Sequence, residues 1–286
     1  MSQSNDAVDF PVFVVLPSSG TGERFGAPLP KQYQIINGMP LFLHTVSAFH
    51  RLPYVKVIAM TVSKDRREYV QSLLETHNFH KVRIAEGGVT RHRSIYNGVK
   101  ALKGVCAPSD VVLIHDVVRI FADNEVVSAV AMAANETGIS EKFASNKTDT
   151  VMLYIILKAA GVTRPLTSTV IGVDADGYLT ESLDRSKFKA SEMPQGFMYS
   201  TISGAYDKAT EYDFDYGTEC LHLAQKYIGS RVKVVEGPSS LWKVKYRITR
   251  NFRNYQILRF YGKIGCLYFH EYNFFVIPKL QRKMFI

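Results

Sequence analysis

Apolar and amphipathic segments alternate along the first half of the chain. The apolar runs are short and rich in β-branched residues, and they lie at 12–16, 55–62, 82–85 and 111–114. The amphipathic segments have helical spacing, and they lie at 40–49, 65–76, 91–102 and 126–136. In the second of these, Tyr69, Leu73 and Thr76 fall on one face of the expected helix. Because buried strands that alternate with helices form parallel sheets, the pattern predicts an α/β fold with a doubly wound, mostly parallel, Rossmann-like sheet.

The second half of the chain departs from this regular alternation. The pattern breaks at 139–158, which begins polar and ends in an apolar run, and a strand is expected again at 159–165. A turn at 174–177 between two extended stretches predicts a protruding β-arm. Further elements are expected as a helix at 201–209, a helix that opens within 215–221, and a strand at 232–237.

The last part of the chain is basic and aromatic. Lysines and arginines alternate with phenylalanines and tyrosines over 247–286, and no pattern places the aromatic side chains on one face of a sheet. Single-stranded nucleic acid is bound by aromatic side chains that are displayed together in a basic groove. We therefore expect no nucleic-acid partner for this tail. At the other end, the polar residues 1–10 are expected to be a flexible segment.

Composition limits the possible classes of protein. The 286 residues include 35 lysines and arginines against 26 aspartates and glutamates, and the net charge of +9 suits a phosphate-rich ligand. Cys106, Cys220 and Cys266 are too scattered for a disulfide framework or a zinc site, which indicates a reducing compartment. The N-terminus has no signal-peptide core, and no window is long and apolar enough to cross a membrane. We expect a cytosolic protein with no membrane partner.

The first chemical motif follows the first predicted strand. The turn 18–22 contains Gly20 and Gly22, which let backbone N–H groups approach an anion without a Cβ in the way. Arg24 and Lys31 then place two cations over the same turn. A buried strand, a glycine-rich turn and trailing cations are typical of a nucleoside triphosphate site. The turn matches neither a Walker motif nor G-x-G-x-x-G, so a solvated surface turn is the alternative.

The second motif lies at the end of the third predicted strand. Gly87 and Gly88 allow the backbone to approach a base or a ribose closely. Arg91 and Ser94, three residues apart, fall on one side of the helix that begins here. The alternative is a helix entry with a solvated arginine.

The third motif follows the fourth predicted strand. A carboxylate at the carboxyl end of a parallel strand lies in the crevice where α/β proteins bind ligands, and Asp116 has this position. Beside a triphosphate it would hold Mg²⁺ together with phosphate oxygens. It could instead cap a helix or pair with Arg119. We expect His115 to be structural.

In this order, the motifs resemble those of the sugar-nucleotide and isoprenoid cytidylyltransferases. The matching strings share their spacing with that family and lie at 20–33, 87–94, 115–119, 191–197 and 241–244. The string S-E-M-P-Q at 191–195 resembles the vertebrate, ribitol-phosphate branch of the family more than the bacterial, isoprenoid branch. The resemblance covers about 11–246 and leaves 247–286 as a divergent tail. It implies that 139–158 is an insertion outside the active-site sheet, with burial in the core as the alternative.

The resemblance also implies an activity and a set of site residues. The expected reaction is Mg²⁺-dependent transfer of the cytidylyl group of CTP to a sugar-alcohol phosphate, with D-ribitol 5-phosphate as the expected acceptor and 2-C-methyl-D-erythritol 4-phosphate as the alternative. The catalytic residues that it implies are Arg24, Lys31, Arg185 and Lys243. The nucleotide-binding residues that it implies are Ser19, Gly20, Thr21, Gly22, Gly88, Arg91, Ser94, Asp116, Arg119 and Thr169, with Asp116 holding the metal.

Two further expectations follow from the resemblance. The arm at about 170–190 is expected to reach across a homodimer, so that Arg185 and Thr169 serve the neighbour's site. A rival hypothesis is a catalytically impaired family member that binds CTP as a regulatory subunit. Its motive is that the Cβ of Ser19 could crowd a triphosphate, and that Ile120 replaces the proline expected after Arg119.

Overall fold

The structure is a computed structural model of the 286-residue chain. It describes residues 8–22, 28–136, 159–238, 241, 244–248, 257–260, 266–270 and 273–277, and from 244 onward the backbone alone. The expectations for the possible insertion at 139–158, and for Arg24 and Lys243, lie outside the described residues.

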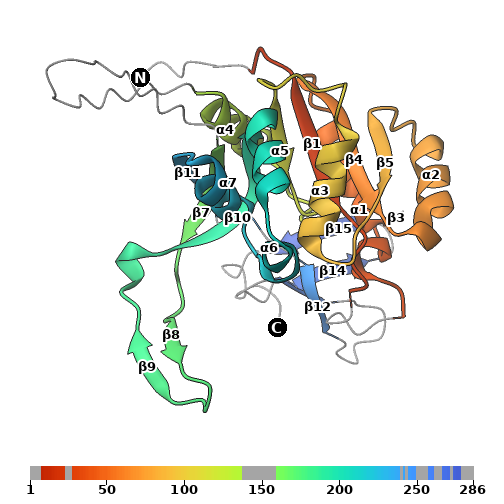
Figure 1. Ribbon diagram of the computed structural model, residues 1–286. Helices are drawn as coiled ribbons and strands as arrows, with labels where there is room; N and C mark the ends of the chain where they lie inside the picture. The colour runs from red at the N-terminus through yellow and green to blue at the C-terminus, as the bar shows by residue number, and fades with distance from the viewer. Residues whose placement is uncertain are drawn as a thin grey trace, which may run out of the picture.

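A seven-stranded sheet forms the centre of the molecule (Figure 1). In spatial order its strands are β11 (Val232–Glu236), β7 (Ala159–Pro165), β10 (Lys189–Met198), β6 (Val111–Ile114), β1 (Val12–Pro17), β4 (Val55–Val62) and β5 (Val82–Glu86). Neighbouring strands are parallel except at β10, which runs antiparallel to both β6 and β7. The prediction of an α/β fold with a doubly wound, mostly parallel sheet is confirmed.

Helices cover both faces of this sheet. The helices on one face are α1 (Leu41–His50), α2 (Arg67–Thr76) and α4 (Asn124–Asn135), and those on the other are α3 (Arg91–Ala101), α5 (Tyr199–Lys208) and α7 (Cys220–Ile228). Side chains alternate across a strand, so the fully apolar β1 contributes side chains to the hydrophobic cores on both faces of the sheet. Val14 and Leu16 pack with α1, α2 and α4, whereas Phe13 and Val15 pack with α3, α5 and α7. This double burial explains why β1 has no polar position.

The buried face of α2 differs from the one that the spacing suggested. Val70 and Leu74 are buried, whereas Tyr69 is 42% exposed and Thr76 is also exposed. The apolar stripe of this helix is wide enough to include both sets, and the aliphatic pair takes the contact with the core. Tyr69 packs at the edge instead, with its ring 5.9 Å from that of Tyr33.

Short elements connect the main ones. These are η2 (Lys31–Tyr33), β2 (Ile35–Ile36), β3 (Met39–Pro40), η3 (Lys64–Arg66), η4 (Arg185–Lys187) and α6 (Glu211–Tyr216). The pattern did not predict α6, which has only six residues. Thr210 begins it with a capping box, because its side chain accepts from the N–H of Asp213 while the carboxylate of Asp213 accepts from the N–H of Thr210.

A two-stranded arm extends away from the sheet (Figure 1). It consists of β8 (Ile171–Val173) and β9 (Leu179–Ser182), paired antiparallel. Asp174 closes the turn, since its Oδ1 accepts from the N–H groups of Asp176 and Tyr178 at 3.0 and 2.8 Å. Gly177 completes it with φ of +88°. The predicted turn and arm are confirmed.

The C-terminal tail contains backbone strands. They are β12 (Val244–Ile248), paired antiparallel with β13 (Ile257–Phe260), and β14 (Cys266–His270), paired antiparallel with β15 (Asn273–Ile277). No strands over 247–286 were named from the sequence, so the strands there are an addition to what it predicted. A search of the described helices finds none with the length and hydropathy of a membrane span.

Candidate nucleotide-binding site

A cavity of about 700 Å³ lies at the carboxyl ends of β1 and β6, beside the start of α3. Three stretches that the sequence singled out meet in its walls, together with the residue that begins η2. The predicted site residues that line it are Ser19, Gly20, Thr21, Gly22, Lys31, Gly88, Arg91, Ser94 and Asp116. Strand ends of one parallel sheet meet at one edge, which is why motifs up to about a hundred positions apart converge here.

The side chain of Gln32 holds the glycine-rich turn in shape. Its Nε2 donates to the carbonyl oxygens of Ser18 at 2.9 Å and of Gly20 at 2.8 Å. In a trans peptide the N–H points opposite to the C=O, so these bonds also fix the N–H groups of Ser19 and Thr21. Backbone N–H groups with fixed directions suit an anion such as a phosphate.

Gly22 completes the turn with φ of +73°, a conformation that side chains disfavour. A Cβ at this position would also lie 3.2 Å from the backbone nitrogen of Lys31. The turn therefore passes close beside the residue that begins η2. This places Lys31, which is partly exposed, on the wall of the cavity.

Ser19 connects the glycine-rich turn to the second motif. Its Oγ lies 2.7 Å from the Oγ of Ser94, which in turn accepts from the N–H of Gly88 at 3.1 Å. A Cβ on Gly87 would lie 2.2 Å from the Cβ of Ser19. Ser19 thus occupies the room that the missing side chain of Gly87 leaves.

The paired glycines have a second structural reason. A Cβ on Gly88 would lie 2.4 Å from the Cβ of Arg93, so this position has no room for one. The sequence reasoning assigned the glycines to close approach by a base or ribose. Their contacts with Ser19 and Arg93 show that close approach of other protein segments already demands them.

Thr90 positions the second motif. It is the N-cap of α3, because its Oγ1 accepts from the N–H of Arg93 at 3.3 Å, and the same hydroxyl donates to the carbonyl of Phe214 at 2.6 Å. The cap fixes where the helix begins, and hence the direction of Arg91. The positive end of the helix dipole also faces the cavity, which favours an anionic ligand.

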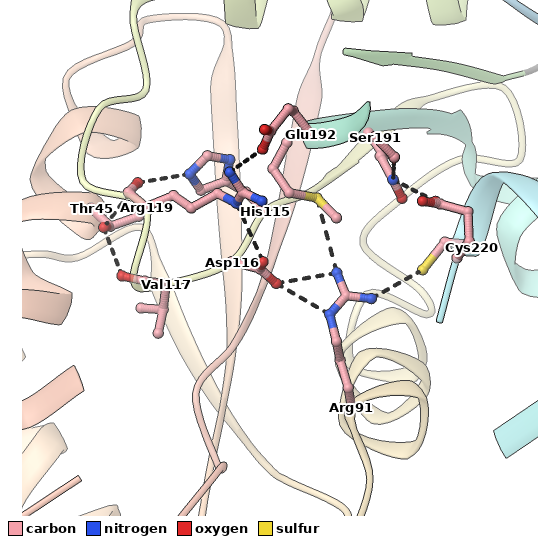
Figure 2. A network of polar contacts seen from close by, with 12 residues as sticks. Thr45, Arg91, His115, Asp116, Val117, Arg119, Ser191, Glu192 and Cys220 are labelled. Atoms are coloured by element: carbon pink, nitrogen blue, oxygen red, sulfur yellow. Dashed lines mark hydrogen bonds and ion pairs between the residues drawn. The ribbon is translucent and has the colours of Figure 1, made fainter. Parts of the chain in front are cut away.

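A chain of alternating charges runs behind the cavity wall (Figure 2). The Oδ1 of Asp116 accepts from Nη2 and Nε of Arg91 at 3.1 and 3.2 Å, and its Oδ2 lies 3.4 Å from Nε of Arg119. The Nη1 of Arg119 donates to Oε2 of Glu192. Arg164 donates to Oε1 of Glu192 through Nη2 and, at 2.9 Å, through Nε. Asp116 therefore pairs with Arg119, as one alternative proposed, and with Arg91.

Neutral side chains surround Arg91 on its other side. Its Nη1 is 3.9 Å from Sγ of Cys220, whose pKa is raised by burial. The hydroxyl of Tyr206 lies 3.5 Å from the same sulfur and 2.9 Å from Nδ1 of His92. Burial, and secondarily the charge of Arg91, lower the pKa of His92 to about 4. These groups hold the guanidinium in place without adding charge beside it.

The remaining predicted residues lie away from the cavity wall. Arg119 is buried behind Asp116 and is not among the described lining residues. Thr169 and Arg185 are exposed at the base of the arm, where Nη1 of Arg185 donates to the carbonyl of Thr167 at 3.3 Å. His115 is buried; its Nε2 is 2.9 Å from the carbonyl oxygen of Arg119, which agrees with the expected structural role.

Sequence reasoning missed three residues of the site, namely Gln32, Thr90 and Glu192. Thr90 could have been found, because a threonine immediately before a helical segment is a typical N-cap. Gln32 and Glu192 stand inside strings that were recognised, but nothing local to either residue indicates what it contacts.

The chemistry of the cavity fits one divalent cation bound together with phosphate. Among the described residues, no group of three or more histidines, cysteines or acids could hold a metal by itself. Among the described residues that line the cavity, only Asp116 has an acidic side chain. Mg²⁺ commonly binds through one or two carboxylates plus substrate phosphates, so a single carboxylate beside a phosphate-binding turn suits it.

Comparison with known proteins gives consistent matches over this region. The family model for IspD, 2-C-methyl-D-erythritol 4-phosphate cytidylyltransferase, matches residues 12–250. D-ribitol-5-phosphate cytidylyltransferase of Mus musculus is 42% identical over 241 residues, covering 82% of this chain and 49% of that protein. 2-C-methyl-D-erythritol 4-phosphate cytidylyltransferase of Geobacter metallireducens is 32% identical over 228 residues, covering 79% and 88%.

A solved structure supports the fold. The crystal structure of 4-diphosphocytidyl-2C-methyl-D-erythritol synthase from Anaerococcus prevotii matches with a TM-score of 0.64 at 24% identity, covering 82% of this chain and 91% of that one. The chain spans about half the length of the mouse relative, 49%. The family match includes the three motifs whose residues line the cavity. The chain therefore belongs to the IspD cytidylyltransferase family.

Proposed function

We propose that this chain transfers the cytidylyl group of CTP to D-ribitol 5-phosphate, giving CDP-ribitol and pyrophosphate. The observation that carries the proposal is the cavity itself, because the glycine-rich turn, Arg91, Ser94 and the carboxylate of Asp116 all line it. The identity of 42% to a D-ribitol-5-phosphate cytidylyltransferase, against 32% to a methylerythritol-phosphate enzyme, supports the choice of acceptor. Cys106 and Cys220 are free thiols, which supports a reducing compartment such as the cytosol.

The protein needs little covalent chemistry of its own for this reaction. A phosphate oxygen of the acceptor attacks the α-phosphorus of CTP in line, the bond from that phosphorus to the bridging oxygen breaks, and pyrophosphate leaves with the electron pair. Catalysis then consists of positioning the reactants and stabilising developing negative charge. Lys31, on the cavity wall, would stabilise that charge and the departing pyrophosphate. Arg24, outside the described residues, is proposed for the same task.

The nucleotide half of the site is assigned to the residues that line the cavity. The N–H groups of the turn 19–22 would cradle the phosphates, and Gly88, Arg91 and Ser94 would select cytidine. Mg²⁺, when bound, neutralises charge on the triphosphate, and Asp116 would hold it. Arg119 lies behind Asp116, so we assign it to supporting that carboxylate rather than to touching the nucleotide.

The acceptor half is proposed to involve a second copy of the chain. Exposed apolar side chains gather on and near the arm, and an isolated hairpin is marginally stable in water, so a partner surface would stabilise it. These side chains are Ile171, Val173, Tyr178, Leu179 and Phe188. We propose that the arm crosses a homodimer, that Arg185 and Thr169 serve the neighbour's site, and that Lys243 grips the acceptor phosphate.

Pyrophosphate release tests the reaction. Purified protein is incubated with CTP, Mg²⁺ and either D-ribitol 5-phosphate or 2-C-methyl-D-erythritol 4-phosphate, with product confirmed by mass spectrometry. We expect the higher kcat/KM with ribitol phosphate. A preference for methylerythritol phosphate would overturn the acceptor assignment, and failure to bind CTP in calorimetry would overturn the nucleotide site.

Mixing two inactive variants tests the dimer. A Lys31→Ala chain retains Arg185, and an Arg185→Ala chain retains Lys31. If the arm serves the neighbour, a mixed dimer contains one intact site, so activity returns on mixing. Activity that stays absent, while copurification of differently tagged chains shows that mixed dimers form, would place Arg185 in its own chain's site or outside both.

A further inference from the structure

Glu192 is a buried acid that sits between two arginines, and neither the expected site residues nor the proposed chemistry accounts for it. Its side chain is 5% exposed, and both of its carboxylate oxygens accept from guanidinium groups. Arg164 provides one partner from β7, and Arg119 provides the other from the segment after β6. A buried carboxylate is costly unless it is paired, and here it is paired on both sides.

The topology of the sheet explains this position. β10 runs antiparallel between β6 and β7, and its register against β7 shifts between Ser191 and Gln195. Glu192 lies inside that shift. Figure 2 shows its carboxylate directed to Arg119, next to Asp116. Glu192 is thus connected to Asp116, on the cavity wall, through the guanidinium of Arg119.

Arg119 divides its hydrogen bonds between two acids. It donates from Nη1 to Glu192, whereas the separation of its Nε from Oδ2 of Asp116 is 3.4 Å, near the outer limit of a hydrogen bond. Charge-assisted N–H···O bonds are normally about 2.7–2.9 Å long. Without the charge on Glu192, Arg119 would turn to Asp116, the nearest remaining carboxylate among its contacts. Asp116 would then accept a close bond from Arg119 as well as those from Arg91, and more of its charge would be neutralised.

We propose that Glu192 is a positioning residue that draws Arg119 away from Asp116, so that the charge of Asp116 stays available to a divalent cation bound with CTP. This inference rests on the proposed function, in which Asp116 holds Mg²⁺. Glu192 does not touch the nucleotide or the metal. It acts through Arg119, and Arg164 balances the charge that Glu192 brings into the protein.

Two single variants and their combination test the proposal. Glu192→Gln keeps the size of the side chain and removes its charge, Arg164→Gln removes the balancing cation, and the double variant removes both. CTP binding is measured by calorimetry at a series of MgCl₂ concentrations, without acceptor so that no turnover occurs. Binding of Mn²⁺ to the CTP-saturated protein, followed by electron paramagnetic resonance, gives a direct measure of the metal. Thermal unfolding reports stability separately.

We expect Glu192→Gln to need about tenfold more Mg²⁺ or Mn²⁺ for half-saturation, equal to about 1.4 kcal/mol, with CTP affinity in the absence of metal unchanged or increased. Arg164→Gln should bind the metal at least as well as the wild type, because Glu192 still engages Arg119. In the double variant the thermal stability should recover, since no buried charge is left without its partner, while the weakened metal binding remains.

The outcomes separate this inference from the proposed function. If the wild-type protein binds no CTP, the proposed function is overturned, and the role of Glu192 is overturned with it. If the wild type binds CTP with the metal and Glu192→Gln has the same metal dependence, the role of Glu192 is overturned while the proposed function stands. A metal dependence that recovers in the double variant together with the stability would show that Glu192 is only a structural partner of Arg164, which also overturns the inference.

Discussion

Replacing Gln32 with leucine should weaken nucleotide binding while leaving the fold intact. The leucine side chain has a similar size, so the buried position stays filled. The amide is lost, and with it both hydrogen bonds to the carbonyl oxygens of Ser18 and Gly20, at 2.9 and 2.8 Å. The turn 18–22 then loses the groups that fix its peptide planes. In the variant, an anion must therefore order these peptide planes when it binds, and this ordering weakens its binding.

The size of the effect follows from the two bonds. A typical hydrogen bond contributes about 0.5–1.5 kcal/mol net, so losing two costs about 1–3 kcal/mol. Gly20 is exposed, so in the free protein its freed carbonyl can turn to water and recover part of this cost. This recovered part is given up again when CTP reorders the turn, so it appears as weaker binding. Since about 1.4 kcal/mol is a factor of ten, we expect the Kd for CTP to rise roughly 5- to 100-fold.

Calorimetric titration with CTP and Mg²⁺ measures the change, and Gln34→Leu is the matched control. Gln34 also donates from Nε2 to one backbone carbonyl, that of Leu29 at 2.7 Å, but it is not among the described residues that line the cavity. The control should bind CTP with nearly wild-type affinity. Equal Kd values for wild type and Gln32→Leu would refute the reasoning. So would equal losses in the two variants, because they would indicate a general loss of stability.

Three further predictions concern the same region. Lys31→Ala should lower kcat by roughly 10²–10³ if this cation stabilises charge that develops in the transition state, and stopped-flow measurement of pyrophosphate release checks it. Ser19→Ala should weaken CTP binding in calorimetry by about 0.5–1.5 kcal/mol through loss of the bond to Ser94, whereas tighter binding by Ser19→Gly, which also removes the Cβ, would favour the rival idea that Ser19 crowds the phosphates. Because burial lowers the folded-state pKa of His92 to about 4 from 6.5, the unfolded chain takes up a proton first as the pH falls, and stability should decrease between those values. Chemical unfolding of His92→Asn should show a shallower decrease across the same window.

The features that could be predicted from the sequence are those that depend on residues close together in the chain. Val12 to Leu16 is apolar at every position, and a strand buried on both faces needs that pattern. The glycine-rich turn follows directly, so its place at the sheet edge could be predicted together with the strand. The same holds for Arg91 and Ser94 at the start of a helix, and for Asp116 after a buried strand. Each of these predictions needs only a strand end and the rule that strand ends of a parallel sheet meet.

The features that could not be predicted depend on distant contacts. The face of α2 that is buried was ambiguous, since Leu73 and Leu74 are neighbours; the packed sheet buries Leu74 and leaves Leu73 only partly buried. Nothing in the sequence around Gln32 indicates its role, which depends on contacts with the carbonyl groups of Ser18 and Gly20. The strands β13, β14 and β15 have no alternating pattern of apolar and polar residues from which they could be predicted.

Glu192 shows that the order of strands in the sheet, rather than any sequence motif, determines which charged residues meet. Its partners, Arg119 and Arg164, are 73 and 28 positions away, and they come together because an antiparallel strand enters between two parallel ones. A doubly wound sheet with β6 directly beside β7 would bring Arg119 and Arg164 toward each other with no acid between them. The inserted strand supplies that acid where the two cations converge. The charge seen by a ligand at Asp116 is therefore set partly by a strand that contributes no described residue to the cavity wall.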